Sequence, residues 1–209
     1  MIDTKHKILD TAERLFANQG YGATSMRQII GEAGVNLASI HYHFGSKEEL
    51  LDGLVERKAG PVNAARLALL DQVQAEAGEK APELEAILHA FLSPVAKGAA
   101  KSEQFVKLMG RLFSEGLLPT VVQKHFHVVM RRFLAAIRSA LPDLPEEEFG
   151  WRFQFMIGAL SHTMCGSEQF REMLGLTSGF EDRLERLARF VIAGFRAPVP
   201  TPATVEVKQ

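Results

Sequence analysis

Apolar side chains recur at helical spacing along most of this chain, and this periodicity constrains its fold more than any other feature of the sequence. Near the N-terminus, for example, Ile8, Ala12, Leu15 and Phe16 fall on one face of a helix over residues 4–18. No stretch alternates apolar and polar residues over the length of a strand. The sequence therefore predicts an all-α fold.

Glycine, proline and helix-capping residues divide the chain into segments. Ser25 and Ser46 each precede a Gln or Glu by three residues, which is a capping-box pattern. Gly60-Pro61 is expected to kink or end the helix that begins near Ser46, because proline lacks a backbone donor. We divide the chain into domains at 1–50 and 51–196 and a disordered tail at 197–209. Helices are predicted at 4–18, twice within 25–43, from 46, and near 62–77, 83–97, 101–115, 120–140, 146–166 and 181–195.

Several classes of protein are excluded by what the sequence lacks. A single cysteine, Cys165, leaves no internal disulfide and no cysteine-based zinc site, and we expect no cofactor. No apolar run reaches the roughly 20 residues of a membrane span, and the N-terminal residues lack the roughly 7–15-residue apolar core of a signal peptide. We therefore expect a cytoplasmic protein without a membrane partner. No phosphate-binding glycine loop, GxSxG or HExxH motif is present, which argues against an enzyme.

Residues 25–44 have the pattern of two short helices joined at a glycine, the helix-turn-helix arrangement. Gly34 can adopt the left-handed turn conformation at little cost. Val35 and Ile40 would pack the second of these helices against the first, and such a helix fits the major groove of DNA. The pattern also fits a helical hairpin that binds no nucleic acid. The side chains left exposed would be Leu37, Ala38, Ser39, His41, Tyr42 and His43.

The residues around this motif resemble the TetR family of transcriptional regulators. The resemblance covers roughly residues 5–55 and is carried by Ala-Thr-Ser at 23–25, Ala-Gly-Val-Asn at 33–36, Tyr-His-Phe at 42–44 and Gly-Ser-Lys-Glu-Glu-Leu at 45–50. It implies an N-terminal three-helix helix-turn-helix domain that binds DNA, and a larger C-terminal helical domain for ligand binding and dimerisation. The implied function is a homodimer, by default a repressor, on a near-palindromic operator of double-stranded DNA.

The resemblance also implies which residues meet DNA. Positions at helix N-termini, which favour anions, match phosphate contacts: Thr24, Ser25 and Lys47. Positions at the start of the recognition helix match contacts to bases: Leu37, Ala38 and Ser39. The remaining candidates for the groove or the DNA backbone are Arg27, Asn36, His41, Tyr42 and His43.

The charge balance predicts how such a domain would bind. The chain has 24 Lys plus Arg and 25 Asp plus Glu, and residues 1–58 contain seven basic and eight acidic side chains. Non-specific attraction to DNA should therefore be modest, because it scales with the number of phosphates neutralised. Affinity for DNA would have to come from contacts made by individual side chains at defined positions, and a dimer would make each of these contacts twice.

The last two predicted helices are candidates for dimer contacts. Residues 149–166 are apolar on more than one face, and residues 181–195 carry a continuous apolar stripe. Both features also fit packing within one chain, but the resemblance favours a four-helix interface between two copies. The predicted interface residues are Trp151, Phe155, Gly158, Ala159, Leu184, Leu187, Val191 and Ile192.

The chain has 14 Phe and 7 Met against 2 Tyr and 1 Trp. Many of the Phe and Met residues recur at helical spacing on the middle helices. Apolar stripes of this kind more often form a core than a pocket, but the middle helices of TetR-family proteins usually enclose a small-molecule site. A lining with few polar groups favours an apolar effector such as a long-chain fatty acid or acyl thioester, and a weaker likeness to fatty-acid-responsive members points the same way. Candidates for a head-group contact are Arg111, Arg131, Arg152 and His162. The predicted lining is Phe91, Phe105, Leu108, Met109, Leu112, Phe113, Phe126, Met130, Phe133, Phe153 and Met156.

Two alternatives stay open at the level of the sequence: a helical interaction module and a small enzyme, neither of which binds DNA. Cys165 fits either an inert buried thiol or a redox switch.

Overall fold

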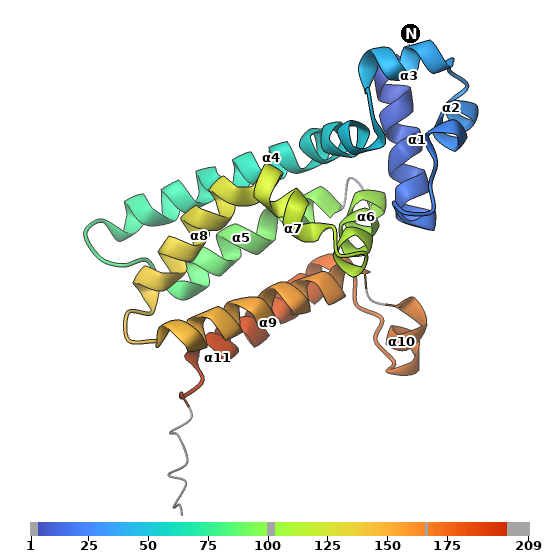
Figure 1. The fold of residues 1–209 in the computed structure, drawn as a ribbon. Helices are drawn as coiled ribbons and strands as arrows, with labels where there is room; N and C mark the ends of the chain where they lie inside the picture. The colour runs from blue at the N-terminus through green and yellow to red at the C-terminus, as the bar shows by residue number, and fades with distance from the viewer. Residues whose placement is uncertain (1–3, 100–102, 166, 200–209) are drawn as a thin grey trace, which may run out of the picture.

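The computed structural model describes residues 4–99, 103–165 and 167–199, and every regular element among them is helical. The helices α1 (Thr4–Gln19), α2 (Met26–Ala33) and α3 (Leu37–His43) form a small N-terminal unit (Figure 1). α4 (Lys47–Ala77) leads from this unit along one side of a larger helical body. The all-α prediction is confirmed.

The body contains five longer helices and three short elements. α9 and α11 pack against each other along the side opposite α4, whereas α10 stands away from both (Figure 1). The region predicted as one helix near 120–140 is divided by a π-helical turn, and α10 was not predicted. The elements are α5 (Leu84–Ala99), α6 (Glu103–Ser114), α7 (Leu118–Val121), η1 (Val122–Phe126), α8 (His127–Ala140), α9 (Glu146–Cys165), α10 (Glu168–Met173) and α11 (Phe180–Arg196).

Gly60-Pro61 does not end a helix, which corrects that part of the prediction. α4 is 31 residues long and includes both residues. Proline removes one backbone donor, but packing on both sides of that point outweighs the loss. Before Pro61 the apolar side chains of α4 pack with those of α1, and after it they pack with those of α5 and α8. α4 is therefore a continuous connection between the N-terminal unit and the body.

The buried apolar side chains form two clusters. One lies in the N-terminal unit and the other lies in the body among α4, α5, α8, α9 and α11. The N-terminal cluster also includes Leu108 and Leu112 of α6, both fully buried. α4, α6 and Val121 of α7 therefore connect the units. No helix among the described residues is long and apolar enough to cross a bilayer. Residues 200–209 of the predicted tail lie outside the described residues.

Candidate DNA interface and ligand cavity

The turn between α2 and α3 is built by local hydrogen bonds. Ser25 caps α2 by accepting from the Gln28 backbone N–H at 3.1 Å. Gly34 ends α2 with φ +60°, a left-handed conformation that a side chain would strain. Asn36 then caps α3 by accepting from the Ser39 backbone N–H at 2.7 Å. A three-residue turn with a capped helix on each side is a helix-turn-helix geometry.

One face of α3 is buried and the other faces solvent. Ile40 is completely buried against the N-terminal cluster, as predicted. On the opposite face Leu37 is 58% exposed and Tyr42 is 85% exposed. Ala38 and His41 are also exposed, whereas Ser39 and His43 are half-buried. Two large side chains held in water by a rigid short helix are available to a partner surface.

The structure corrects the role expected of Thr24. Its side chain is only 1% exposed, and its hydroxyl donates to the Gly20 carbonyl at 2.8 Å. The hydroxyl proton of Thr24 is used in this hydrogen bond, which closes the turn after α1, so the hydroxyl cannot donate to a phosphate. Ser25 and Asn36 use their side-chain oxygens as caps and remain exposed. Each keeps a side-chain donor, a hydroxyl on Ser25 and an amide on Asn36, that the cap does not use.

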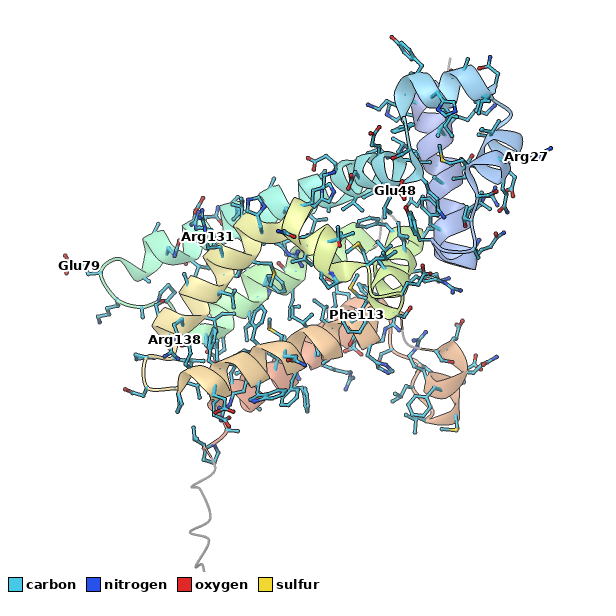
Figure 2. The ribbon with its side chains drawn as sticks, viewed as in Figure 1. Arg27, Glu48, Glu79, Phe113, Arg131 and Arg138 are labelled. Carbon is cyan, nitrogen blue, oxygen red and sulfur yellow. The ribbon has the colours of Figure 1, made fainter. Side chains whose placement is uncertain are left out.

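Lys47 and Arg27 flank α3 on the neighbouring helices. The Lys47 amine lies 4.2 Å from the centre of the Tyr21 ring, a cation–π contact that holds the side chain near the start of α4. The Tyr21 hydroxyl donates to Glu48 at 3.1 Å. Burial and this carboxylate raise the pKa of Tyr21 to about 12. Arg27 projects outward from α2, clear of the body (Figure 2).

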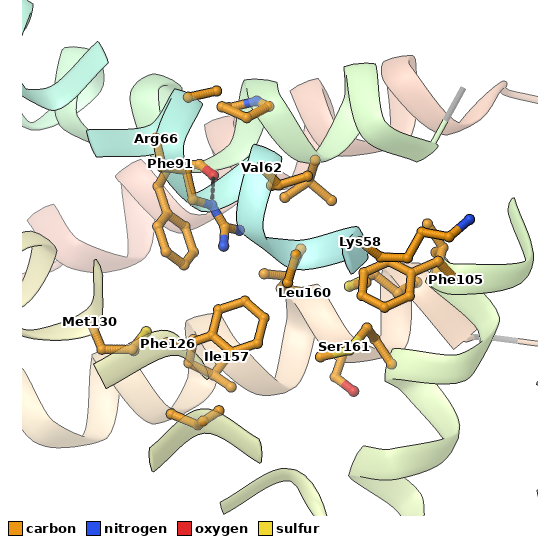
Figure 3. A pocket seen from close by; sticks show the side chains of 18 of the residues that line it. Lys58, Val62, Arg66, Phe91, Phe105, Phe126, Met130, Ile157, Leu160 and Ser161 are labelled. Atoms are coloured by element: carbon orange, nitrogen blue, oxygen red, sulfur yellow. Dashed lines mark hydrogen bonds between the residues drawn. The ribbon is translucent and has the colours of Figure 1, made fainter. Parts of the chain in front are cut away.

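A cavity of about 1030 Å³ lies in the body, at the upper end of the range for small-molecule sites. Figure 3 shows Phe105, Phe126, Ile157 and Leu160 around its interior. Most of the lining is apolar. The lining residues are Arg57, Lys58, Ala59, Pro61, Val62, Ala65, Arg66, Ala68, Leu69, Gln72, Phe91, Pro94, Val95, Lys97, Phe105, Val106, Met109, Phe113, Gly116, Pro119, Val122, Phe126, Met130, Phe153, Ile157, Leu160, Ser161 and Met164.

Seven of the eleven predicted lining residues line this cavity: Phe91, Phe105, Met109, Phe113, Phe126, Met130 and Phe153. The other four were assigned wrongly, because each is buried in a hydrophobic cluster instead. Leu108 and Leu112 lie on the face of α6 that packs into the N-terminal cluster. Phe133 and Met156 are in the core of the body.

Four basic residues line the cavity, and no Asp or Glu is among its described lining residues. None of the four predicted head-group candidates lines it, and two of them bind backbone oxygens elsewhere. Arg111 donates to the carbonyls of Ala17 and Asn18, at 3.1 and 2.9 Å. Arg152 donates to the carbonyls of Phe195 and Ala197, each at 2.8 Å.

Ion pairs join the cavity wall on α4 to α1. Glu13 of α1 is buried and accepts from the Lys58 amine at 2.8 Å, and the Arg57 guanidinium lies 3.5 Å away. Arg57 also pairs with Asp10 at 2.8 Å. Because Arg57 and Lys58 line the cavity as well, a ligand there would compete for groups that hold the N-terminal unit.

A second link runs from the cavity through α6. Glu115, the residue that follows the end of α6, accepts from the backbone N–H groups of Tyr21 and Gly22, at 3.2 and 3.1 Å. Gly20 is required at this turn, because its φ is +94° and a Cβ would stand 2.3 Å from a Glu115 oxygen. Since Phe113 of α6 lines the cavity, this helix connects the ligand space to the turn before α2.

The π-helix η1 is held to α4 by a charged cluster. The ring nitrogens of His125 lie 3.1 Å from Asp52 and 3.2 Å from Glu56, and Lys124 also pairs with Asp52. Burial raises the pKa of Asp52, but the hydrogen bonds from Lys124 and His125 outweigh it and leave that pKa lowered. Phe126 of η1 lines the cavity, so this cluster fixes another part of the wall.

Replacing Glu13 with glutamine should lower the free energy of unfolding by about 1–3 kcal/mol, because it removes the buried charge that Lys58 and Arg57 face. Urea unfolding followed by circular dichroism measures this change. Glu76→Gln, an exposed position on α4, is the matched control and should change stability little. An E13Q variant as stable as the control would show that the ion pairs contribute nothing to the junction.

The predicted dimer residues differ in their exposure and fall into three groups. Trp151 and Phe155 of α9 are 49% and 65% exposed, with their rings 6.0 Å apart. Ile192, Gly158 and Ala159 are half-buried. Leu184, Leu187 and Val191 were assigned wrongly, because the apolar stripe of α11 packs on α5 and α9 of the same chain. The large exposed ring on α11 is Phe190, at 71%, which the sequence reasoning missed.

The residues of both units match known families. Residues 85–194 match the family described as "Tetracyclin repressor-like, C-terminal domain", and residues 8–54 match "Bacterial regulatory proteins, tetR family". The chain belongs to the TetR family. This is a family of DNA-binding transcriptional regulators rather than enzymes, so membership counts against both alternatives left open by the sequence.

Curated TetR-family relatives match this chain over part of their own length. The transcriptional regulator LmrA of Bacillus subtilis (strain 168) is 51% identical over 49 residues, which are 23% of this chain and 26% of that protein. The transcriptional regulator BetI of Rhizobium meliloti (strain 1021) is 33% identical over 115 residues, 49% of this chain and 55% of that protein. The chain therefore aligns with between about a quarter and just over half of these relatives.

Solved TetR-family structures share the whole fold at low identity. The ketosteroid transcriptional regulator KstR2 of Mycobacterium tuberculosis has a TM-score of 0.65 at 17% identity, covering 93% of this chain and 95% of that one. The fatty acid degradation regulator FadR of Bacillus halodurans has a TM-score of 0.56 at 17% identity, covering 95% and 99%. These likenesses establish the arrangement of helices.

Proposed function

We propose that this regulator is a homodimeric repressor that leaves a near-palindromic operator when an apolar small molecule occupies the cavity. A ligand can only do this if it binds the conformation that does not fit DNA more tightly than the one that does. Long-chain acyl compounds are the favoured effectors. The observation that carries the proposal is that α4 and α6 both line the cavity and hold the N-terminal unit.

The cavity lining supports an apolar effector. Its interior combines Phe, Met, Val, Leu and Ile side chains, which favour apolar ligands through burial of surface. Two structural neighbours are named as regulators for a ketosteroid and for fatty acid degradation, and both names refer to largely hydrocarbon compounds. A steroid is therefore the competing effector class, and a direct comparison of the two ligands separates them.

The dimer would form through α9 and α11. Both helices expose large aromatic rings, Trp151 and Phe155 on one and Phe190 on the other. Rings left in water on neighbouring helices are typical of a surface that a partner covers. A second copy of the chain is the occupant that a symmetric operator requires, because each half-site takes one recognition helix.

The test is a gel shift with the DNA upstream of the protein's own gene. The expected result is a discrete complex at nanomolar protein, whose affinity falls at least tenfold when tetradecanoate is added to saturation. The slope of log affinity against log salt should be clearly negative, because Lys47 and Arg27 are proposed to neutralise phosphates. A slope near zero would contradict those roles, and an unchanged affinity would reject the acyl effector class.

A further inference from the structure

Arg66 of α4 is a buried cation on the cavity wall. Its side chain is 5% exposed, and its Nε donates to the Phe91 carbonyl at 2.9 Å. Nη1 lies 3.4 Å from the Asn63 Oδ1 atom, and Cζ stacks 4.1 Å from the centre of the Phe91 ring. Figure 3 shows the terminal nitrogens turned toward the cavity interior, with Leu160 and Phe126 beyond them.

The partners of this guanidinium are all uncharged. Within the described part of the chain, no Asp or Glu pairs with Arg66, although Arg57 and Lys58 on the same wall pair with Asp10 and Glu13. Burial without an acidic partner lowers the pKa of Arg66 to about 10, so the group is still cationic at neutral pH. A buried charge without a counter-ion is costly, and such groups are concentrated where a ligand supplies the opposite charge.

We infer that Arg66 is the receptor for a free carboxylate at the end of an apolar effector. The hydrocarbon part would fill the Phe- and Met-lined space, and the carboxylate would accept from the guanidinium in the forked geometry that arginine offers. This inference rests on the proposed effector role of the cavity and narrows it. It names the chemical class as a free amphipathic carboxylic acid.

Arg66 would also discriminate between related ligands. A neutral ester or alcohol of the same chain length fills the same space but leaves the cation buried and unpaired, and sites built for a charged or hydrogen-bonded group reject such analogues strongly. A thioester has no free carboxylate at the acyl end, so it cannot form this pair. The acid is therefore favoured over the thioester, a choice that the sequence left open.

Ligand binding measured in the absence of DNA tests this inference separately from repression. Delipidated protein is titrated with tetradecanoate, methyl tetradecanoate and tetradecanoyl-coenzyme A, followed by calorimetry and by the shift in melting temperature. For the native chain the acid should bind at least tenfold more tightly than the ester, ~1.4 kcal/mol, and more tightly than the thioester. In Arg66→Gln the acid should lose this advantage, whereas binding of the ester should stay within threefold of the native value.

Two controls keep the outcome decisive. Arg131→Gln changes an exposed cation of α8 that does not line the cavity, and it should preserve the preference for the acid. If Arg66→Gln does not fold, the comparison of the three ligands on the native chain still decides. Equal binding of acid and ester, an acid preference that survives R66Q, or tighter binding of the thioester would each overturn the assignment. None of these results would bear on operator binding, which the gel shift measures alone.

Discussion

Ala38→Glu should weaken operator binding at least a hundredfold, ~2.7 kcal/mol, without unfolding the protein. Ala38 lies on the exposed face of α3, beside Leu37 and Tyr42, so a glutamate there enters the proposed interface in both copies of the dimer. The added carboxylate meets the phosphate field of the groove and loses its hydration. Position-specific contacts each contribute about 1–3 kcal/mol, and the symmetric site doubles them.

Fluorescence anisotropy with the operator fragment measures this loss, and thermal unfolding measures the stability. Glutamate is a good helix former, and an exposed substitution changes stability by roughly 0.5 kcal/mol or less. Ala64→Glu, an exposed alanine on α4, is the matched control and should bind DNA normally. Affinity for A38E within threefold of the native value would mean that α3 is not the recognition helix.

Phe155→Asp should convert the dimer into monomers at micromolar concentration. Phe155 is 65% exposed and stacked against Trp151, so the aspartate would place a charge at the centre of the proposed contact between copies. Burying that charge without a partner costs several kcal/mol in each half of a symmetric interface. Operator affinity should fall as well, because the two recognition helices are no longer linked.

Sedimentation velocity gives the oligomeric state directly. Val128→Asp on α8, at a position 41% exposed, is the control and should leave the oligomer intact. Phe190→Asp tests the contribution of α11 and should also dissociate the protein. If both F155D and F190D sediment like the native chain, the rings of α9 and α11 do not form the interface.

The sequence predicted the N-terminal unit closely because the relevant signals are local. Ser25, Gly34 and Asn36 act on neighbouring backbone groups, and the caps and turn that they imply are those of the structure. Thr24 was assigned wrongly because its burial depends on a turn closed by the Gly20 carbonyl. That contact is not visible in the spacing of residues.

The cavity and the dimer face were harder to predict, because they depend on which face of each helix meets another helix. On α6, Met109 and Phe113 face the cavity, while Leu108 and Leu112, one position earlier in each pair, enter the other cluster. The continuous apolar stripe of α11 packs within the chain, and the ring of Phe190 on another side of that helix is exposed. Nothing in the sequence singled out Arg66 as a buried residue, because a basic residue among alanines and leucines of a helix is expected to be exposed to solvent.

The unbroken course of α4 makes it a lever arm. Its 31 residues extend about 46 Å at ~1.5 Å per residue. At Pro61 the arm lacks one backbone hydrogen bond, so bending is easier there than elsewhere along the shaft. A tilt of roughly 5° at that point would displace the start of α4, roughly 21 Å away, and the recognition helix that precedes it by about 2 Å. Two such displacements in a dimer change the span between half-sites, which DNA fixes at roughly 34 Å.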